Sequence, residues 1–229
     1  MILAALRFFA HIPFVIPRVC LLAVGLLATA ACHRPNIIGV QGGLTPAAIA
    51  KADGGQVAIT QADIDFMSGM IGHHAQAIVM AGWASSHSTN AAVRVLSERI
   101  VVAQRDEIGL MQGWLRERKL SVPEADPAGW RMIMNGQPHT MRMPGMLSPE
   151  QMKELDAARG ANFDRLFLRY MIQHHEGAIT MVEQLFASHG AVQDELVFKF
   201  ASDVQVDQTT EIARMKLMLE SIPSGVGSP

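Results

Sequence analysis

Apolar residues recur at steps of three and four along four long stretches of the chain, which shorter polar or Pro- and Gly-containing segments separate. This spacing places apolar side chains on one face of an α-helix. None of the four stretches contains a proline, which would interrupt a helix. We therefore predict four long amphipathic helices. Their ranges are residues 60–86, 90–119, 164–182 and 192–219.

The first and third stretches repeat one sequence design. MIGHHAQAIVMA at residues 70–81 reappears as MIQHHEGAITMV at residues 171–182, and nine of the 18 positions from Asp63 to Met80 are identical at an offset of 101. Each copy has a His-His pair, with one methionine three residues before its first histidine and another seven residues after it. The second and fourth stretches correspond as well, at an offset of 104. Their matching residues are Gln104, Glu107, Ile108 and Met111 in one and Gln208, Glu211, Ile212 and Met215 in the other.

A short helix is predicted before each pair of long helices. LTPAAIAKADGG places Thr45 before Pro46, and LSPEQMKELDAARG places Ser148 before Pro149. Threonine and serine favour the N-cap of a helix, and proline favours its first position. The expected fold is therefore all-α: a four-helix bundle built from two repeated helical hairpins, each preceded by a short helix. Facing helices commonly build metal sites in the core of such a bundle.

Residues 120–147 connect the two halves and are rich in Pro, Gly and Met. A connection of this length, with little helical or strand pattern, is more often functional than incidental. Methionine also fills irregular gaps well, so packing over one end of the bundle is the alternative to a metal-binding role. Its methionines are Met132, Met134, Met141, Met143 and Met146, with His139 among them.

The paired histidines cover two adjacent edges of one helix face. His74 shares a stripe with Met67 and Met70, whereas His73 lies about 100° further round the helix, beside Met80. Packing the two histidine helices together would gather four imidazoles and four thioethers, and which of them share one ion stays open. The candidate metal ligands are Met70, His73, His74, Met80, Met171, His174, His175 and Met181.

Thioether and imidazole together favour copper. Thioether sulfur prefers Cu(I), and imidazole binds copper, zinc, nickel and iron, so another transition metal is the alternative to Cu(I) or Cu(II). A ligating histidine usually donates its second ring N–H to a nearby acceptor. Asp63, Asp164 and Glu176 are the acceptors that we expect in this role.

The first 31 residues are predicted to be an export signal. Arg7 and Arg18 carry their only charged side chains, and residues 19–31 form an apolar run of 13, which is short for a membrane-spanning helix. The small residues before Cys32 are similar to a bacterial lipoprotein signal, which predicts acylation of Cys32 and an exported, periplasmic protein held to the membrane by lipid. Ordinary cleavage after the preceding alanines, leaving a free thiol, is the alternative.

Without that signal the chain has 17 basic and 21 acidic residues, so its charge does not suit nucleic acid. Cys32 is then the only cysteine, which excludes an internal disulfide and a thiolate metal site. Any soft metal ligand must therefore be a methionine, and 14 of the 15 methionines remain after Met1 is removed with the signal. The expected organisation is a signal at 1–31, a tether and short helix at 32–59, a helical domain at 60–222 (halves 60–119 and 148–222 around the connection) and a tail at 223–229.

The sequences FMSGMIGHHAQAIVMA and FLRYMIQHHEGAITMV, with MPGMLSPEQMKEL between them, resemble the bacterial domain-of-unknown-function 305 family over Thr60 to Ile222. The resemblance implies an exported, ferritin-like four-helix bundle that binds copper and protects against excess metal. It nominates the same eight histidines and methionines as ligands, followed by Met143 and Met146. The two copies differ directly after the His-His pair, where Gln76 and Glu176 are among the unlike residues, so the halves need not be equivalent.

Three classes of function are compatible with these patterns. A non-enzymatic copper buffer or carrier is favoured, because no catalytic set is recognisable. A di-iron or di-manganese carboxylate enzyme uses Glu-x-x-His motifs, and the sequence has none. Oxidation of Cu(I) is a narrower alternative within the enzymatic class. The third class is an interaction module with a methionine-lined apolar groove. The metal ion is the expected partner, while a protein partner and homo-oligomerisation stay open.

Overall fold

The computed structural model describes residues 58–222. The predicted signal sequence, Cys32, the tether, the short helix after Thr45 and the tail from residue 223 lie outside the described residues. Among residues 58–222, no helix combines the length and the apolarity that crossing a membrane requires.

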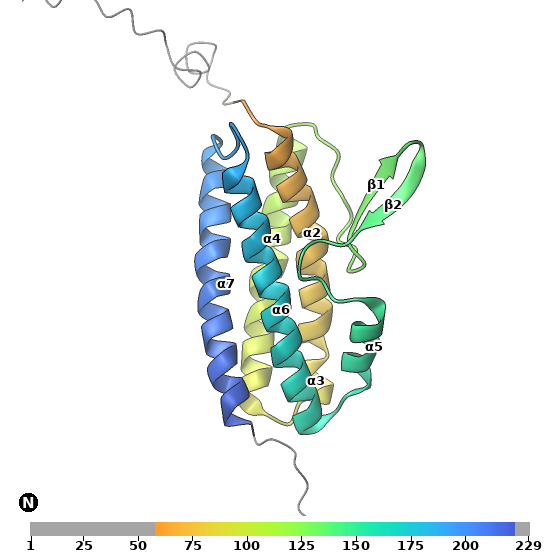
Figure 1. Ribbon diagram of the computed structural model, residues 1–229, viewed down its shortest axis with the longest axis vertical. Coiled ribbons are helices and arrows are strands. Elements are labelled where there is room, and N and C mark those ends of the chain that lie inside the picture. Colours follow the sequence, from red (N-terminus) through yellow and green to blue (C-terminus); the bar gives the residue numbers. More distant parts are fainter. Residues whose placement is uncertain (1–57, 223–229) are drawn as a thin grey trace, which may run out of the picture. The chain divides into compact units, whose positions relative to one another are not determined.

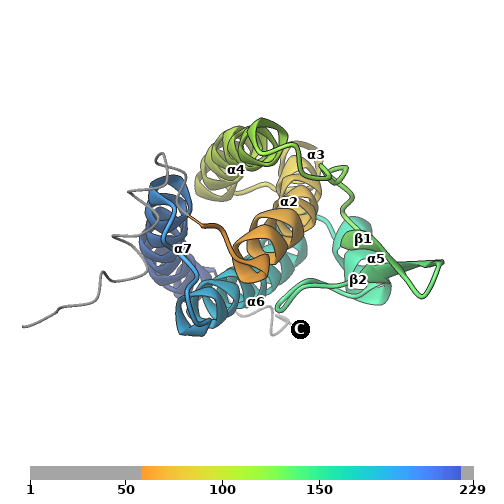
Figure 2. The same cartoon turned by 90° about the horizontal axis from the view of Figure 1, so that it is seen from above.

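Four long helices lie side by side and make up most of the described chain (Figures 1 and 2). α2 and α6 pack against each other in opposite directions, α4 lies along α2, and α7 lies along α6. The predicted helical class is thus confirmed, whereas its ferritin-like character stays a prediction. The elements are α2 (Gln61–Gly82), α3 (Ala84–His87), α4 (Ala91–Glu117), β1 (Trp130–Met134), β2 (Gln137–Met141), α5 (Pro149–Ala157), α6 (Gly160–Ala187) and α7 (Glu195–Ser221).

Side-chain caps fix where most of the helices begin. Thr60 caps α2, and its hydroxyl accepts from the amide of Asp63 while the Asp63 carboxylate accepts from the amide of Thr60. Ser148 forms the same kind of box before α5, with Pro149 at the first helical position as predicted. Asn90 and Asp194 cap α4 and α7. One expected boundary was wrong: a single helix to residue 86 was predicted, but α2 ends at Gly82 and the short α3 follows.

The connection between the halves contains a two-stranded antiparallel hairpin, so the prediction of little strand pattern was wrong. β1 and β2 pair from Trp130 opposite Met141 to Met134 opposite Gln137. Asn135 and Gly136 form the turn with φ angles of 52° and 74°. Positive φ at both turn residues is the requirement of a type I′ turn, for which Asn-Gly is the favoured sequence.

Glycines allow the connection to approach the histidine helices closely. A Cβ on Gly177 would lie 2.0 Å from the carbonyl oxygen of Pro144, and a Cβ on Gly72 would lie 2.8 Å from the backbone of Gly129. No larger residue fits at either place without moving the backbone. Hydrogen bonds from Gln76 also join α2 to the connection. Its side chain donates to the carbonyl oxygens of Pro127 and Leu147 and accepts from the Leu147 amide. The connection is therefore held against α2 and α6.

Buried apolar side chains form two clusters between the helices. One contains Met70 of α2 and Met181 of α6, and the other contains Met80 of α2 and Met171 of α6. This pairing follows from the antiparallel packing, which places the first half of α2 beside the second half of α6. The His-His pairs occupy the middle of both helices, so they form a buried layer between the two clusters. We call this layer the histidine layer (His73, His74, His174 and His175).

Candidate metal centre

All four side chains of the histidine layer are fully buried, with exposed fractions of 0%. The rings of His73 and His174 lie close together across the contact between α2 and α6, with centroids 3.8 Å apart and planes inclined by 39°. Within each pair the centroids are further apart, at 6.2 Å for His73 and His74 and 6.3 Å for His174 and His175. The structure therefore brings together the four imidazoles that the repeat predicts.

Three of these imidazoles have an oxygen next to Nε2. His73 Nε2 donates to the carbonyl oxygen of Pro144 at 3.0 Å, and His175 Nε2 donates to Glu211 Oε2 at 2.7 Å. His74 Nε2 lies 2.7 Å from Glu107 Oε2, although the angle of approach falls outside hydrogen-bond geometry. Carbonyl and carboxylate oxygens only accept, so they favour the tautomer with the proton on Nε2. Nδ1 then carries the free lone pair.

The Nδ1 atoms of all four histidines are buried and have no hydrogen-bond partner, and Nε2 of His74 and of His174 has none either. A buried polar atom without a partner costs about 1–3 kcal/mol, so the four Nδ1 atoms in one layer require an explanation. A bound metal ion would supply one, because a neutral imidazole offers this lone pair to metals. The donor set thus fits a metal of the kind that imidazole prefers.

Burial keeps the imidazoles of His73 and His174 neutral. It is the main reason why the pKa of His73 falls to about 3, and the neighbouring His74 lowers it further. Burial, followed by the charge that His73 would carry, also holds the pKa of His174 well below its usual range. Protons therefore do not compete for these two lone pairs near neutral pH.

The methionine candidates lie on both sides of the histidine layer. Met70 and Met181 border it in one apolar cluster, and Met80 and Met171 border it in the other. Met67 is buried beside Met70. The imidazoles and thioethers are thus grouped as predicted, in neighbouring layers of the core. Which sulfur shares an ion with which nitrogen stays open.

Two methionines of the connection lie against the same helices. Met143 Sδ sits where a side chain on Gly69 would be, 2.7 Å from the position of its Cβ. Met146 Sδ accepts from the Met143 amide at 3.2 Å, which occupies one of its lone pairs. Met143 is therefore the freer of the two sulfurs.

The carboxylates expected beside the histidines have other partners. Asp63 accepts from the amides of Thr60 and Val192, and Asp164 accepts from the hydroxyl of Ser88, so each ties a loop to the start of a histidine helix. Glu176 is exposed and lies 3.5 Å from Lys216.

Glu107 and Glu211 take the place next to the imidazoles instead. They come from the return helices α4 and α7 and occupy equivalent positions in the repeated sequence. That equivalence was a signal that could have identified them, because Glu107 and Glu211 are the acidic pair that the two return helices repeat in register.

Negative charge gathers around the two His–Glu pairs. Burial, and then the charges of Glu107, Asp203 and Glu211, raise the pKa of Asp207. The side chains of Glu107 and Glu211 are 23% and 26% exposed, so they reach from the histidine layer to solvent. Such a field favours the approach of cations.

No group of three or more His, Cys, Asp or Glu side chains within residues 58–222 is arranged to hold one ion. A site here needs the thioethers, or a rotation of the imidazole rings, to complete its ligands.

Comparison with known proteins places the chain in a family. The model of the family described as "Domain of unknown function (DUF305)" matches residues 63–219. The chain belongs to the DUF305 family. The predicted resemblance is therefore confirmed, and the matched residues include both histidine helices and both return helices.

Solved structures of related proteins have the same fold. A candidate secreted DUF305 protein from Streptomyces coelicolor is 27% identical, with a TM-score of 0.60 over 73% of this chain and 98% of that one. CopM in its Cu(I)-bound form is 28% identical, with a TM-score of 0.53 over 69% of this chain and 95% of CopM. Its Cu(II)-bound form is 30% identical, with a TM-score of 0.54 over the same shares.

A curated relative is similar over a shorter part. An uncharacterised protein of Acanthamoeba polyphaga mimivirus is 39% identical over 64 residues, which is 27% of this chain. The match spans 42% of that protein, so this chain covers less than half of the relative's length.

Proposed function

We propose that this protein binds copper in the histidine layer and its flanking methionines, and that it acts as a non-enzymatic buffer or carrier in copper tolerance. The unpartnered Nδ1 atoms of the four buried histidines are the observation that carries the proposal. The bordering thioethers suit Cu(I), and the imidazoles also accept Cu(II). The copper-bound forms of CopM, a protein of similar fold, support the same choice of metal.

Glu107 and Glu211 have a defined part in this proposal. Glu211 accepts the Nε2 proton of His175 and so aims Nδ1 of that ring at the metal, which also makes Nδ1 more basic. Pro144 does the same for His73 through its carbonyl oxygen. The Glu107 carboxylate, 2.7 Å from His74 Nε2, favours the same tautomer of His74 through its charge. The ligands come from α2 and α6, whereas the groups that orient them come from α4, α7 and the connection.

We further propose that the protein is exported and works in the periplasm, held to the membrane through lipid on Cys32. The support is the sequence pattern of the first 32 residues, together with the similarity to a candidate secreted protein. Such an anchor would keep the helical domain where copper first reaches the cell. Labelling with a radioactive fatty acid tests the anchor, since Cys32→Ala should abolish incorporation.

Copper titration of the purified protein tests the proposed binding. The protein should take up Cu(I) under reducing conditions stoichiometrically, in competition with a chromophoric chelator, and more tightly than micromolar. Replacing Glu107 and Glu211 together by Gln should weaken binding roughly 10–100-fold, because the charge that fixes the imidazole tautomer is lost.

Glu176→Gln is the matched control, since Glu176 lies on a histidine helix but is exposed and bound to Lys216. It should leave the affinity unchanged. Substoichiometric binding of micromolar strength or weaker by the unaltered protein would overturn the proposal. An equal loss in the control would overturn the orienting role of the two glutamates.

A further inference from the structure

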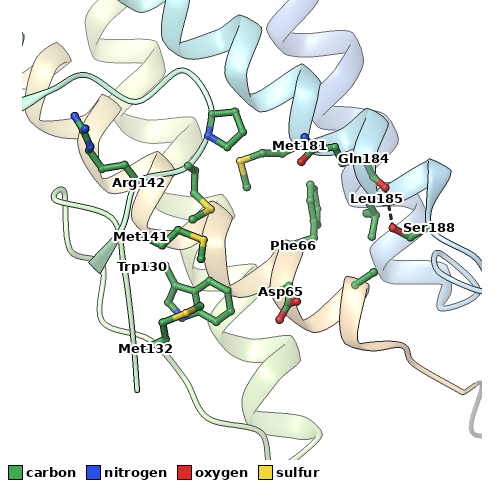
Figure 3. Close-up of a pocket in the computed structure, with 13 residues that line it drawn as sticks. Asp65, Phe66, Trp130, Met132, Met141, Arg142, Met181, Gln184, Leu185 and Ser188 are labelled. Atoms are coloured by element: carbon green, nitrogen blue, oxygen red, sulfur yellow. Dashed lines mark hydrogen bonds between the residues drawn. The ribbon is translucent and has the colours of Figure 1, made fainter. Parts of the chain in front are cut away.

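A group of thioethers lies around a surface pocket of about 360 Å³, and it shares Met143 and Met181 with the methionines near the histidine layer (Figure 3). The walls of this pocket come from the hairpin, the segment that follows β2, the start of α2 and the end of α6. We call it the methionine pocket. Its sulfur-bearing residues are Met132, Met141, Met143 and Met181.

Strand pairing turns the hairpin methionines towards this pocket. Trp130 is directly opposite Met141 in the hairpin, so their side chains share one face, and Met132 shares it because it is two residues from Trp130. Figure 3 shows these three side chains together on one wall, with Phe66 and Met181 across from them. The other face of β1 carries Ile133, which is 71% exposed. The hairpin therefore directs the face that carries Met132 and Met141 towards the pocket. The residues of β2 are still exposed to solvent along the whole strand.

The remaining two thioethers meet at a glycine of α2. A Cβ on Gly69 would lie 2.7 Å from Met143 Sδ and 3.5 Å from Met181 Cε. Both side chains therefore occupy the space that the absent side chain leaves free. This brings a residue of the connection and a residue of α6 to the same point of the pocket wall.

We propose that the methionine pocket is a second metal site, selective for a soft monovalent cation, Cu(I) or Ag(I). Thioether is a neutral, soft ligand that favours Cu(I), whereas Zn(II) and Cu(II) need imidazole, carboxylate or thiolate. The pocket lining contains no histidine and no cysteine, and Asp65 is its only carboxylate. The indole face of Trp130 can add a cation–π contact.

Two consecutive residues link the methionine pocket to the histidine layer. Met143 lines the pocket, and the next residue, Pro144, holds His73 through its carbonyl oxygen. A cation in the pocket would thus be bound within reach of solvent, beside the buried layer. The pocket itself uses no imidazole, so this inference does not depend on copper binding by the histidines.

Silver titration of the full-length protein tests the pocket, with Ag(I) as an air-stable soft monovalent probe and methionine methyl groups labelled with ¹³C. The methyl signals of Met132 and Met141 should shift until one equivalent is bound at this site. Leucine has nearly the volume of methionine but no sulfur. The double variant Met132→Leu and Met141→Leu should therefore bind one Ag(I) fewer, as counted by native mass spectrometry.

Two controls separate this site from the proposed histidine site. Met134→Leu changes a hairpin methionine outside the pocket lining and should retain the full count. A variant with all four layer histidines changed to Gln should keep the shifts of Met132 and Met141. The inference is overturned if the double leucine variant keeps the full stoichiometry, if the two shifts vanish with the histidines, or if Zn(II) produces them as well.

Discussion

At the scale of single residues, the buried imidazoles combine two properties that rarely occur together. His73 and His174 are removed from water, and this burial is the main reason why the pKa of each is lowered. Their Nδ1 atoms nevertheless have no hydrogen-bond partner that would replace the lost hydration. A packed core would avoid this cost with apolar side chains. The chain retains the histidines in both halves, and a metal ion is the partner that suits neutral nitrogen lone pairs.

The metal-free protein should lose stability as the pH falls through the range below the unfolded pKa of about 6.5. His73 and His174 stay neutral in the folded state, because burial depresses each pKa, while the unfolded chain takes up protons below that value. The free energy of unfolding should therefore fall by about 1.4 kcal/mol per pH unit for each histidine, down to a pH of about 3 for His73. Urea unfolding at pH 7 and pH 5, in the presence of a chelator, measures the difference.

His73→Gln with His174→Gln should flatten that pH dependence, since glutamine does not titrate. His139→Gln, which alters an exposed histidine of the hairpin, should leave it as steep as in the unaltered protein. An equally steep loss of stability in the double variant would show that these two imidazoles are not its source.

Sequence reasoning at this scale predicted that the four imidazoles lie together, but it missed the carboxylates that lie next to them. The repeated His-His pairs and their spacing to methionine placed all four imidazoles together, since helical periodicity alone determines which residues share a face. The acceptors were assigned to Asp63, Asp164 and Glu176 because those residues lie on the same helices. The structure gives that position to Glu107 and Glu211, which reach the layer only through the packing of α4 on α2 and α7 on α6.

At the scale of secondary-structure elements, the long connection is an ordered part of the helical domain. Its hairpin was missed although Asn135-Gly136 is a strong turn signal, because methionines and Pro138 obscure the alternation that usually marks strands. Its attachment to the helices could not be predicted from the sequence. A glycine permits a close approach, but the sequence does not show which other segment of the backbone packs against it. Gly177 and Pro144 meet over a distance of 33 residues in sequence.

Gly177→Ala should disrupt this attachment. The new methyl carbon would lie 2.0 Å from the carbonyl oxygen of Pro144, so the connection must move, at a cost of about 1–3 kcal/mol in the free energy of unfolding. Copper affinity should fall as well, because the same carbonyl orients His73. Thermal unfolding of the metal-free protein, followed by copper titration, measures both effects.

Gly109→Ala is the matched control, because Gly109 is also a glycine within a helix. Nothing lies within 4 Å of its Cβ position, so the substitution should stabilise α4 by up to about 1 kcal/mol through helix propensity alone. If both variants unfold alike, the close approach at Gly177 contributes nothing to stability.

At the scale of the whole molecule, two hairpins of similar sequence pack so that their histidine helices are in contact. The repeat predicted this helical architecture, because two amphipathic hairpins bury their apolar faces best against each other. The antiparallel contact of α2 and α6 then places each His-His pair opposite the other and one apolar, methionine-containing cluster on either side. The proposed site thus needs both halves, and neither hairpin alone could build it.

X-ray diffraction from crystals of the copper-loaded protein, with anomalous data recorded at the copper absorption edge, tests the central claim most directly. The account predicts an anomalous peak in the histidine layer, bonded to Nδ1 atoms from both α2 and α6, with Glu107 and Glu211 still beside Nε2. Copper peaks only elsewhere on the molecule, with the four Nδ1 atoms free of metal, would contradict it.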